Sequence, residues 1–145
     1  TNLYGPNDNY DLNNSHVLPA LIKKFHEAKK NNLPYVDVWG SGAPKREFLH
    51  VDDLASAVLF ALNSKLPDYL YNVGSGKEIS INDLAILVKR VIDYKGEIKF
   101  DYSKPDGTPR KLMDSSKFRK TGWSDKVSLE EGIINTYKNF LLEQY

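Results

Sequence analysis

Three groups of residues in this sequence combine side-chain types that could act on a small anionic molecule. The first joins the stretch Asn2-Leu3-Tyr4-Gly5-Pro6 to His16. A short apolar run closed by Gly-Pro predicts a strand end and a turn, where open α/β folds bind ligands. A histidine near a helix N-terminus favours the neutral imidazole, which can accept or deliver a proton near neutral pH. The alternative is a cap-region histidine bonded to backbone.

The second group is basic and suits a diphosphate. Its members are Lys23, Lys24, Lys45, Arg46, Arg110 and Lys111. Two phosphate charges need a few positioned cations, and a guanidinium can make a two-pronged contact. Arg46 is the stronger candidate of its pair because it opens a predicted strand that should hold it rigidly. The alternative for each of these residues is a solvated surface charge, since Lys and Arg are mostly exposed.

The third group is the polar segment 103–111, which contains the turn Pro105-Asp106-Gly107. A carboxylate such as that of Asp106 accepts hydrogen bonds from ribose hydroxyls or base N–H groups, and proline reduces the cost of ordering a loop on binding. An ordinary surface loop is the alternative. Trp39 ends a predicted strand and could stack on a base or sugar ring, or belong to the core.

The elements that must position these groups alternate between helices and short strands, which predicts a mixed α/β fold. Predicted helices begin near Ser15, Asp52, Ser80, Ser115 and Ser128, and predicted strands lie at 1–4, 35–39, 46–50, 69–73 and 97–102. In the second helix we expect Leu54, Val58, Ala61 and Leu62 on the buried face. A glycine-rich dinucleotide-binding motif after a strand is missing, so we expect the main cofactor site to lie upstream.

Composition excludes several classes of function. The net charge of +1 gives no reason to expect nucleic acid or an acidic membrane surface as partner, and no apolar run is long enough to cross a bilayer. There is no cysteine, and the three histidines share no metal-ligand spacing, so no metal site is predicted. We find no secretory leader and no initiator methionine, and interpret the sequence as a piece of a longer protein.

Several strings resemble known enzymes. Thr1 to Asn9, Arg46 to Asp53 and Asn72 to Gly76 resemble motifs of the extended short-chain dehydrogenase/reductase superfamily. Two longer strings, Ser15 to Ala28 and Lys104 to Asp114, resemble the GDP-L-fucose synthase family specifically. The similarity keeps its order from the first residue to near the last.

The resemblance implies the C-terminal substrate-binding part of such an enzyme, lacking most of the Rossmann domain. Residues 1–145 would form a single domain, with residues 1–6 as the end of a Rossmann-domain strand. This NADP-dependent oxidoreductase and epimerase family converts GDP-4-keto-6-deoxy-D-mannose to GDP-L-fucose, inverting C3 and C5 before NADPH reduces the C4 ketone. By position, the resemblance implies that His16 is catalytic. It implies that the NADP(H) cofactor is bound by Thr1, Asn2, Leu3 and His16. It implies that the GDP-sugar is bound by Lys24, Trp39, Arg46, Asp106 and Lys111.

The family's remaining catalytic residues lie upstream: a Ser and a Tyr/Lys pair that polarise the ketone, and a cysteine partner for the histidine. We therefore expect the isolated chain to have no turnover and at best weak affinity for GDP. Lys24 stands where many relatives have Arg, so the positive charge is kept but the two-pronged contact of a guanidinium is lost. The full-length enzyme is expected to be a cytoplasmic homodimer. Two alternatives stay open: another nucleotide-sugar epimerase or dehydratase of the superfamily, or a non-catalytic nucleotide-sugar-binding domain.

Overall fold

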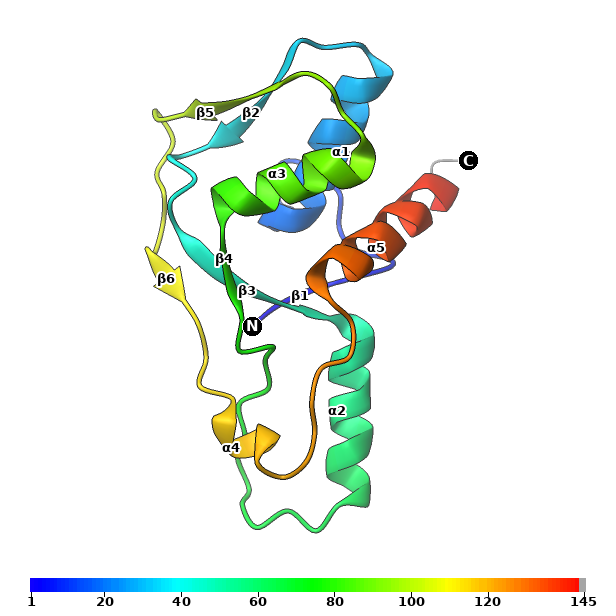
Figure 1. Cartoon of the computed structure of the whole chain (residues 1–145), viewed down its shortest axis with the longest axis vertical. Helices are drawn as coiled ribbons and strands as arrows, with labels where there is room; N and C mark the ends of the chain where they lie inside the picture. Colours follow the sequence, from blue (N-terminus) through cyan, green and yellow to red (C-terminus); the bar gives the residue numbers. More distant parts are fainter. Residues whose placement is uncertain (144–145) are drawn as a thin grey trace.

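Five helices and six short strands make up residues 1–143, which a computed structural model describes (Figure 1). The helices are α1 (Val17–Lys30), α2 (Val51–Asn63), α3 (Ile81–Ile92), α4 (Ser116–Arg119) and α5 (Leu129–Glu143). The strands are β1 (Asn2–Tyr4), β2 (Tyr35–Trp39), β3 (Lys45–His50), β4 (Glu78–Ser80), β5 (Glu97–Asp101) and β6 (Arg110–Lys111). The predicted mixed α/β fold is confirmed. Within residues 1–143, no helix has the length and apolar content needed to cross a membrane.

Strand β3 is the centre of the main sheet. Its second half pairs in parallel with β1, in the register Asn2 to Phe48 through Tyr4 to His50. Its first half pairs antiparallel with β4 and parallel with β6. Strands β2 and β5 form a separate parallel pair. Because β3 touches three strands, it links the predicted cofactor residues on β1 to the predicted substrate residue on β6.

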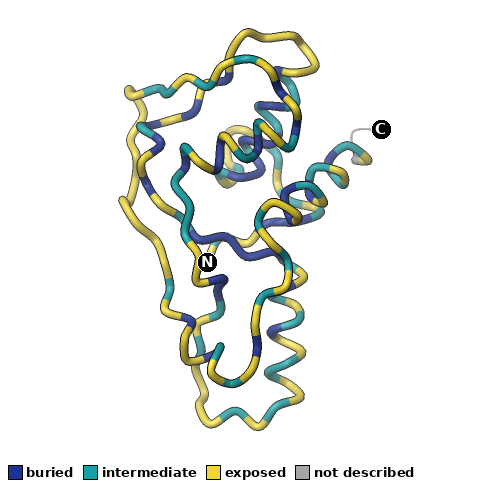
Figure 2. The backbone as a smooth tube through the Cα atoms, in the orientation of Figure 1, coloured by how far each residue is buried: buried dark blue, intermediate teal, exposed yellow. Residues whose placement is uncertain are grey.

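The main apolar core lies between α1, α3 and α5 (Figures 1 and 2). Its fully buried members include Phe25 of α1, Val88 of α3 and Ile133 of α5. The predicted starts of two of these helices near Ser80 and Ser128 are confirmed, because Ser80 Oγ accepts from the Asp83 N–H at 3.0 Å and Ser128 Oγ accepts from the Glu131 N–H at 3.2 Å. These local bonds satisfy donors that a helix N-terminus leaves free.

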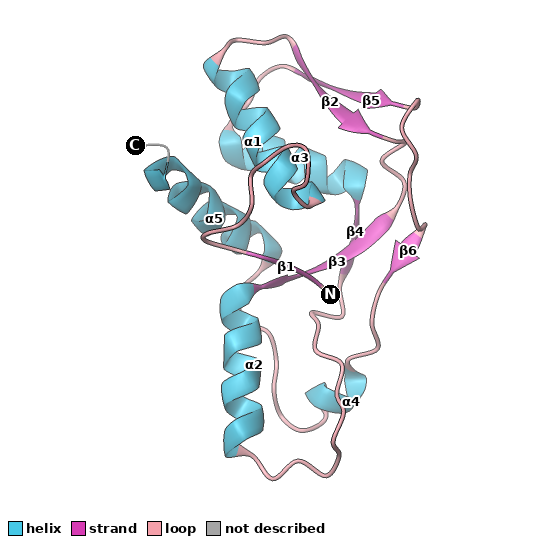
Figure 3. Cartoon of the chain, turned by 180° about the vertical axis from the view of Figure 1, so that it is seen from behind, coloured by secondary structure: helices cyan, strands magenta, loops and turns pink. Residues whose placement is uncertain are grey.

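A smaller cluster sits at the other end, between α2 and α4 (Figure 3). Trp123 is 5% exposed there, and its Nε1 donates to Ser56 Oγ at 3.0 Å. The predicted buried face of α2 is partly wrong. Leu54 and Ala61 pack on the cluster, but Val58 is 53% and Leu62 77% exposed. The helix carries two apolar stripes, and periodicity did not say which of them is covered.

Three other local predictions differ from the structure. The residue before α1 is His16, not Ser15, and no side chain caps this helix. Residues 69–73 are not a strand, because no ladder partner lies beside them in the described part of the chain. Strands β4 and β6 were not predicted, since two or three residues carry no periodic signal.

Candidate functional site

The Trp39 indole ends β2 and stands open to solvent, with 60% of its surface exposed. Beside it lies a cavity of about 230 Å³, lined by Leu12, Ser15, Val17, Ala20, Leu21, Lys24, Val38, Trp39 and Ile81. This cavity brings together two of the predicted substrate residues, Lys24 and Trp39. Its walls are mostly aliphatic, and an exposed aromatic ring over such walls suits the flat face of a base or sugar.

Lys24 reaches this cavity from α1. Its ammonium donates to the Asp37 carbonyl at 3.0 Å and lies 5.2 Å from the centroid of the Trp39 ring. Burial lowers the pKa of Lys24, while the nearby Asp37 and Asp101 carboxylates oppose that shift. No carboxylate lies within ion-pairing distance of Lys24 among the residues described. The cation is therefore held near the aromatic ring and is free to meet an anion.

Asp106 is fixed to the turn that follows Trp39. Its Oδ1 accepts from the Ser41 N–H at 2.6 Å, and its Oδ2 accepts from the Ser41 hydroxyl at 2.8 Å. These two bonds hold the pKa of the Asp106 carboxyl below its usual range. Gly40, with φ of +79°, is required at this point because a Cβ there would overlap the Asp106 carboxylate. The structure thus gives Asp106 a role in holding the 102–109 loop beside Trp39.

Arg46 and Lys111 are neighbours across the β3–β6 ladder. Arg46 Nη1 donates to the Lys45 carbonyl at 2.7 Å. Arg46 Nη2 lies close to Gly107, since it would be 3.7 Å from a Cβ built on that glycine. Neither Arg46 nor Lys111 has a carboxylate within 4.0 Å in the described chain. Two unpaired cations therefore sit side by side at the edge of the main sheet, next to the loop that carries Asp106.

Thr1 and Asn2 meet Lys111 at a second cavity, of about 380 Å³, which Glu47, Leu112 and Met113 also line. The Asn2 side-chain amide donates to the Glu47 carbonyl at 2.8 Å, which fixes β1 against β3. Leu3, the third predicted cofactor residue, is 38% exposed and does not line this cavity.

Glu47 is a buried carboxylate that sequence reasoning did not single out. It is 1% exposed, and its Oε1 accepts from the Gly76 N–H at 2.6 Å. An acid directly before the apolar pair Phe48-Leu49 in a predicted strand was the available signal, because an acid in a buried strand needs a specific partner. Its contacts tie the Gly74-Ser75-Gly76 turn to β3.

His16 is exposed at the start of α1, between Ser15 and Val17, which both line the Trp39 cavity. It is not walled into apolar packing, so its imidazole is open to a ligand. Asp8, on the preceding loop, interacts electrostatically with His16; burial raises the pKa of Asp8, and the Asn9 N–H and His16 partly offset that rise. His16 itself does not line the cavity, and its side chain is exposed to solvent.

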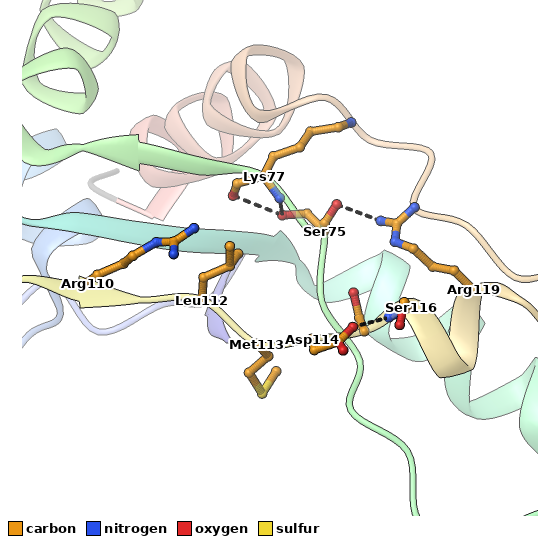
Figure 4. Close-up of a pocket in the computed structure, with 10 residues that line it drawn as sticks. Ser75, Lys77, Arg110, Leu112, Met113, Asp114, Ser116 and Arg119 are labelled. Atoms are coloured by element: carbon orange, nitrogen blue, oxygen red, sulfur yellow. Dashed lines mark hydrogen bonds between the residues drawn. The ribbon is translucent and has the colours of Figure 1, made fainter.

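A wider cavity of about 680 Å³ lies between β6, α4 and the turn at 75–77 (Figure 4). Its three cations are already engaged: Arg110 pairs with Glu78 at 2.6 Å, and Lys77 and Arg119 both pair with Asp125. None of the predicted substrate residues lines it. With its charges neutralised, this cavity is a weaker candidate for a diphosphate than the surface around Trp39.

The residues present fit one edge of a dinucleotide cofactor. Thr1 and Asn2 are ordered by bonds to β3 and line a cavity whose other walls are Glu47, Lys111 and the apolar Leu112 and Met113. A glycine-rich phosphate-binding turn after a strand, which would hold the pyrophosphate of the cofactor, is missing from this sequence. Thr1 and Asn2 are therefore the residues of this chain that would contact one end of such a cofactor, and His16 lines neither this cavity nor the one beside Trp39.

Comparison with known proteins points to one family. The sequence model of the NAD dependent epimerase/dehydratase family matches residues 1–74. The probable GDP-L-fucose synthase 1 of Oryza sativa subsp. japonica is 59% identical over 138 residues, which are 95% of this chain and 42% of that protein.

Two solved structures are similar over nearly the whole chain. A GDP-L-fucose synthetase from Naegleria fowleri matches with a TM-score of 0.92 and 32% identity, over 99% of this chain and 44% of that one. A GDP-6-OMe-4-keto-L-xylo-heptose reductase from C. jejuni matches with a TM-score of 0.87 and 33% identity, over 98% of this chain and 52% of that one. The chain spans about half the length of these relatives.

Proposed function

This chain belongs to the NAD dependent epimerase/dehydratase family, and on that premise we propose that it is the nucleotide-sugar-binding part of an NADP-dependent GDP-L-fucose synthase. Its substrate is a GDP-linked 4-keto-6-deoxy-hexose. The proposal draws support from the 59% identity to a probable GDP-L-fucose synthase. The observation that carries it is that Lys24 and Trp39 line one cavity, with the Asp106 loop bonded to the turn that follows Trp39.

Each residue in this proposal has a physical role. Trp39 supplies an aromatic surface for the base or sugar, and Lys24, Arg46 and Lys111 are cations without carboxylate partners that bind the diphosphate. The electrostatic attraction needs no net positive charge on the whole chain, because it acts over a few ångströms.

His16 is the proton carrier of the proposed reaction. The C4 ketone acidifies the C–H bonds at C3 and C5, so one imidazole within reach can take or return protons at both centres. NADPH, when bound, supplies the hydride that reduces the ketone. The order of the loop before α1 supports this role, since its Asp11 carbonyl accepts from the Ser15 N–H at 2.7 Å.

Binding by the isolated chain tests the substrate class. Titration with GDP and UDP should quench Trp39 fluorescence, since Trp39 is 60% exposed and the other tryptophan, Trp123, is 5% exposed. We expect GDP to bind about tenfold more tightly than UDP, in line with the discrimination that hydrogen-bonded base contacts give. Equal affinity for the two nucleotides would contradict the assignment to GDP-sugars. We expect no NADPH oxidation by the isolated chain, and measurable oxidation would show that it carries a complete active site.

A reductase that does not epimerise its sugar is the second candidate. The likeness to a GDP-6-OMe-4-keto-L-xylo-heptose reductase is nearly as high as that to the fucose synthetase. Full-length protein in deuterium oxide separates the two. Epimerisation places deuterium at C3 and C5 of the product, and His16→Gln should reduce that incorporation by about a hundredfold, as expected for a lost general base. Wild-type product without deuterium would favour the reductase.

A further inference from the structure

Two ammonium groups from distant parts of the chain converge on the Trp39 ring. The Nζ of Lys24, on α1, lies 5.2 Å from the ring centroid, and the Nζ of Lys104, on the loop after β5, lies 5.5 Å from it. Both ammonium groups act electrostatically on the Asp101 carboxylate and help to lower its pKa, and an anionic ligand at the exposed ring would be attracted by both of them. In residues 1–143 neither ammonium has a carboxylate within 4.0 Å.

The position of Lys104 is set by bonds on both sides of it. Before it, the Asp101 carbonyl accepts from the Gly40 N–H at 3.0 Å and from the Lys104 N–H at 3.1 Å, and the Asp101 carboxylate accepts from the Ser103 hydroxyl at 2.6 Å. After it, Asp106 is held by the two bonds from Ser41. Both anchors join the loop to the turn that follows Trp39. The backbone at Lys104 is therefore fixed next to the indole, which lowers the entropy cost of using its side chain for binding.

We propose that Lys104 is a further phosphate-binding residue of this site. It contacts the diphosphate of the nucleotide bound at Trp39, and it reaches the ring from the loop after β5, whereas Lys24 reaches it from α1. The inference rests on the proposed function, because it takes the ligand to be a nucleoside diphosphate. Lys24 and Lys104 then supply two positive charges at one aromatic platform. A cation beside a phosphate makes a charge-assisted hydrogen bond, which is stronger than one between neutral groups.

Lys99 offers a matched control. It is an exposed lysine on β5, and its Nζ lies 3.8 Å from the centroid of the Tyr35 ring. Tyr35 opens β2 and Trp39 ends it, so the two rings are separated by the length of a five-residue strand, about 13 Å. Lys99→Gln removes the same charge and the same kind of aromatic contact from the same two-stranded sheet. A general effect of net charge would therefore appear equally in Lys99→Gln and Lys104→Gln.

The experiment is titration of the 145-residue chain with GDP and with guanosine at low salt, followed by Trp39 fluorescence. We expect Lys104→Gln to weaken GDP binding about threefold to tenfold, as for one exposed charge-assisted contact, and to leave guanosine binding unchanged. Lys104→Arg should keep the affinity, and Lys99→Gln should stay within about twofold of wild type. Circular dichroism melting of each variant checks that the fold is retained.

Two results would overturn the inference while leaving the proposed function intact. One is GDP binding by Lys104→Gln at wild-type strength, and the other is an equal loss for guanosine and GDP, which would place Lys104 at the base. A wild-type chain that binds neither GDP nor guanosine at millimolar concentration would reject the proposed function and this inference together.

Discussion

The Trp39 end of the molecule and the β1–α2 end differ in how completely their groups are paired. At the Trp39 end, both oxygens of Asp106 are bonded to Ser41 and the Gly40 N–H is bonded to Asp101. At the other end, β1 has a ladder partner on one side within the described chain, and one stripe of α2 is exposed. That stripe consists of Ala55, Val58, Leu59 and Leu62.

The difference shows which of the two ends is ordered by contacts within this chain. Bonds within the chain order the turn after Trp39, where we propose the nucleotide site. The proposed cofactor site lies on a strand with an open edge, beside apolar surface that folded proteins usually cover. The chain spans about half the length of its relatives, and the two proposed sites differ in how far contacts within it order them.

The largest effect should come from the core that supports the Trp39 end. Phe25 of α1 is fully buried, and Phe25→Ala should lower the free energy of unfolding by about 3–5 kcal/mol through lost burial and a cavity. Leu62→Ala, at a position 77% exposed on α2, should change it by less than about 0.5 kcal/mol. Urea unfolding followed by circular dichroism measures both. A large cost for Leu62→Ala would mean that the α2 stripe is covered in solution, and its dependence on protein concentration would show whether a second copy covers it.

A smaller effect should come from the turn after Trp39. Gly40→Ala forces a side chain into a backbone with φ of +79° and displaces the Asp106 carboxylate, so we expect a loss of about 2–3 kcal/mol and weaker GDP binding.

Gly107→Ala is the control for that substitution. Its φ is +70°, but the nearest heavy atom to the new Cβ is 3.7 Å away. Gly107→Ala should lower the free energy of unfolding by only about 1 kcal/mol, the cost of a side chain at a positive φ, and should leave GDP affinity unchanged. Equal losses in the two variants would show that Asp106 does not hold the loop.

The smallest effect is a pH dependence of the same anchor. The Ser41 bonds hold the pKa of Asp106 below its ordinary value, so the stabilisation is complete above the unfolded pKa of about 3.9 and is lost as pH falls through the lower, folded pKa. Ser41→Ala removes the bond from the Ser41 hydroxyl to Asp106. The 102–109 loop should then detach from the turn after Trp39 at a higher pH than in wild type. Quenching of Trp39 by acrylamide measures the release. Because Asp101 also has a lowered pKa from its Ser103 bonds, the difference between wild type and Ser41→Ala isolates Asp106. Identical release curves would contradict the anchor.

Much of the fold could be predicted because its signals are local. The capping box at Ser80 and Asp83, and the apolar spacing from Leu84 to Ile92, fix α3 without reference to the rest of the chain. Strand β6 could not be found this way, since Arg110 and Lys111 become a strand only where β3 presents an edge to them. Residues 69–73 have the composition of a strand but no partner in the described chain, and composition does not supply one.

The candidate site divides in the same way. By itself, the sequence indicated which side chains could serve: a tryptophan at a strand end, several cations, an imidazole near a helix start and a carboxylate on a stiff loop. The tertiary structure alone decided which of them meet, and that the Asp106 carboxylate is held by Ser41, 65 residues away. Spacing along a helix or strand is set by backbone geometry and can be read from the sequence, whereas contact between distant segments depends on how the core packs.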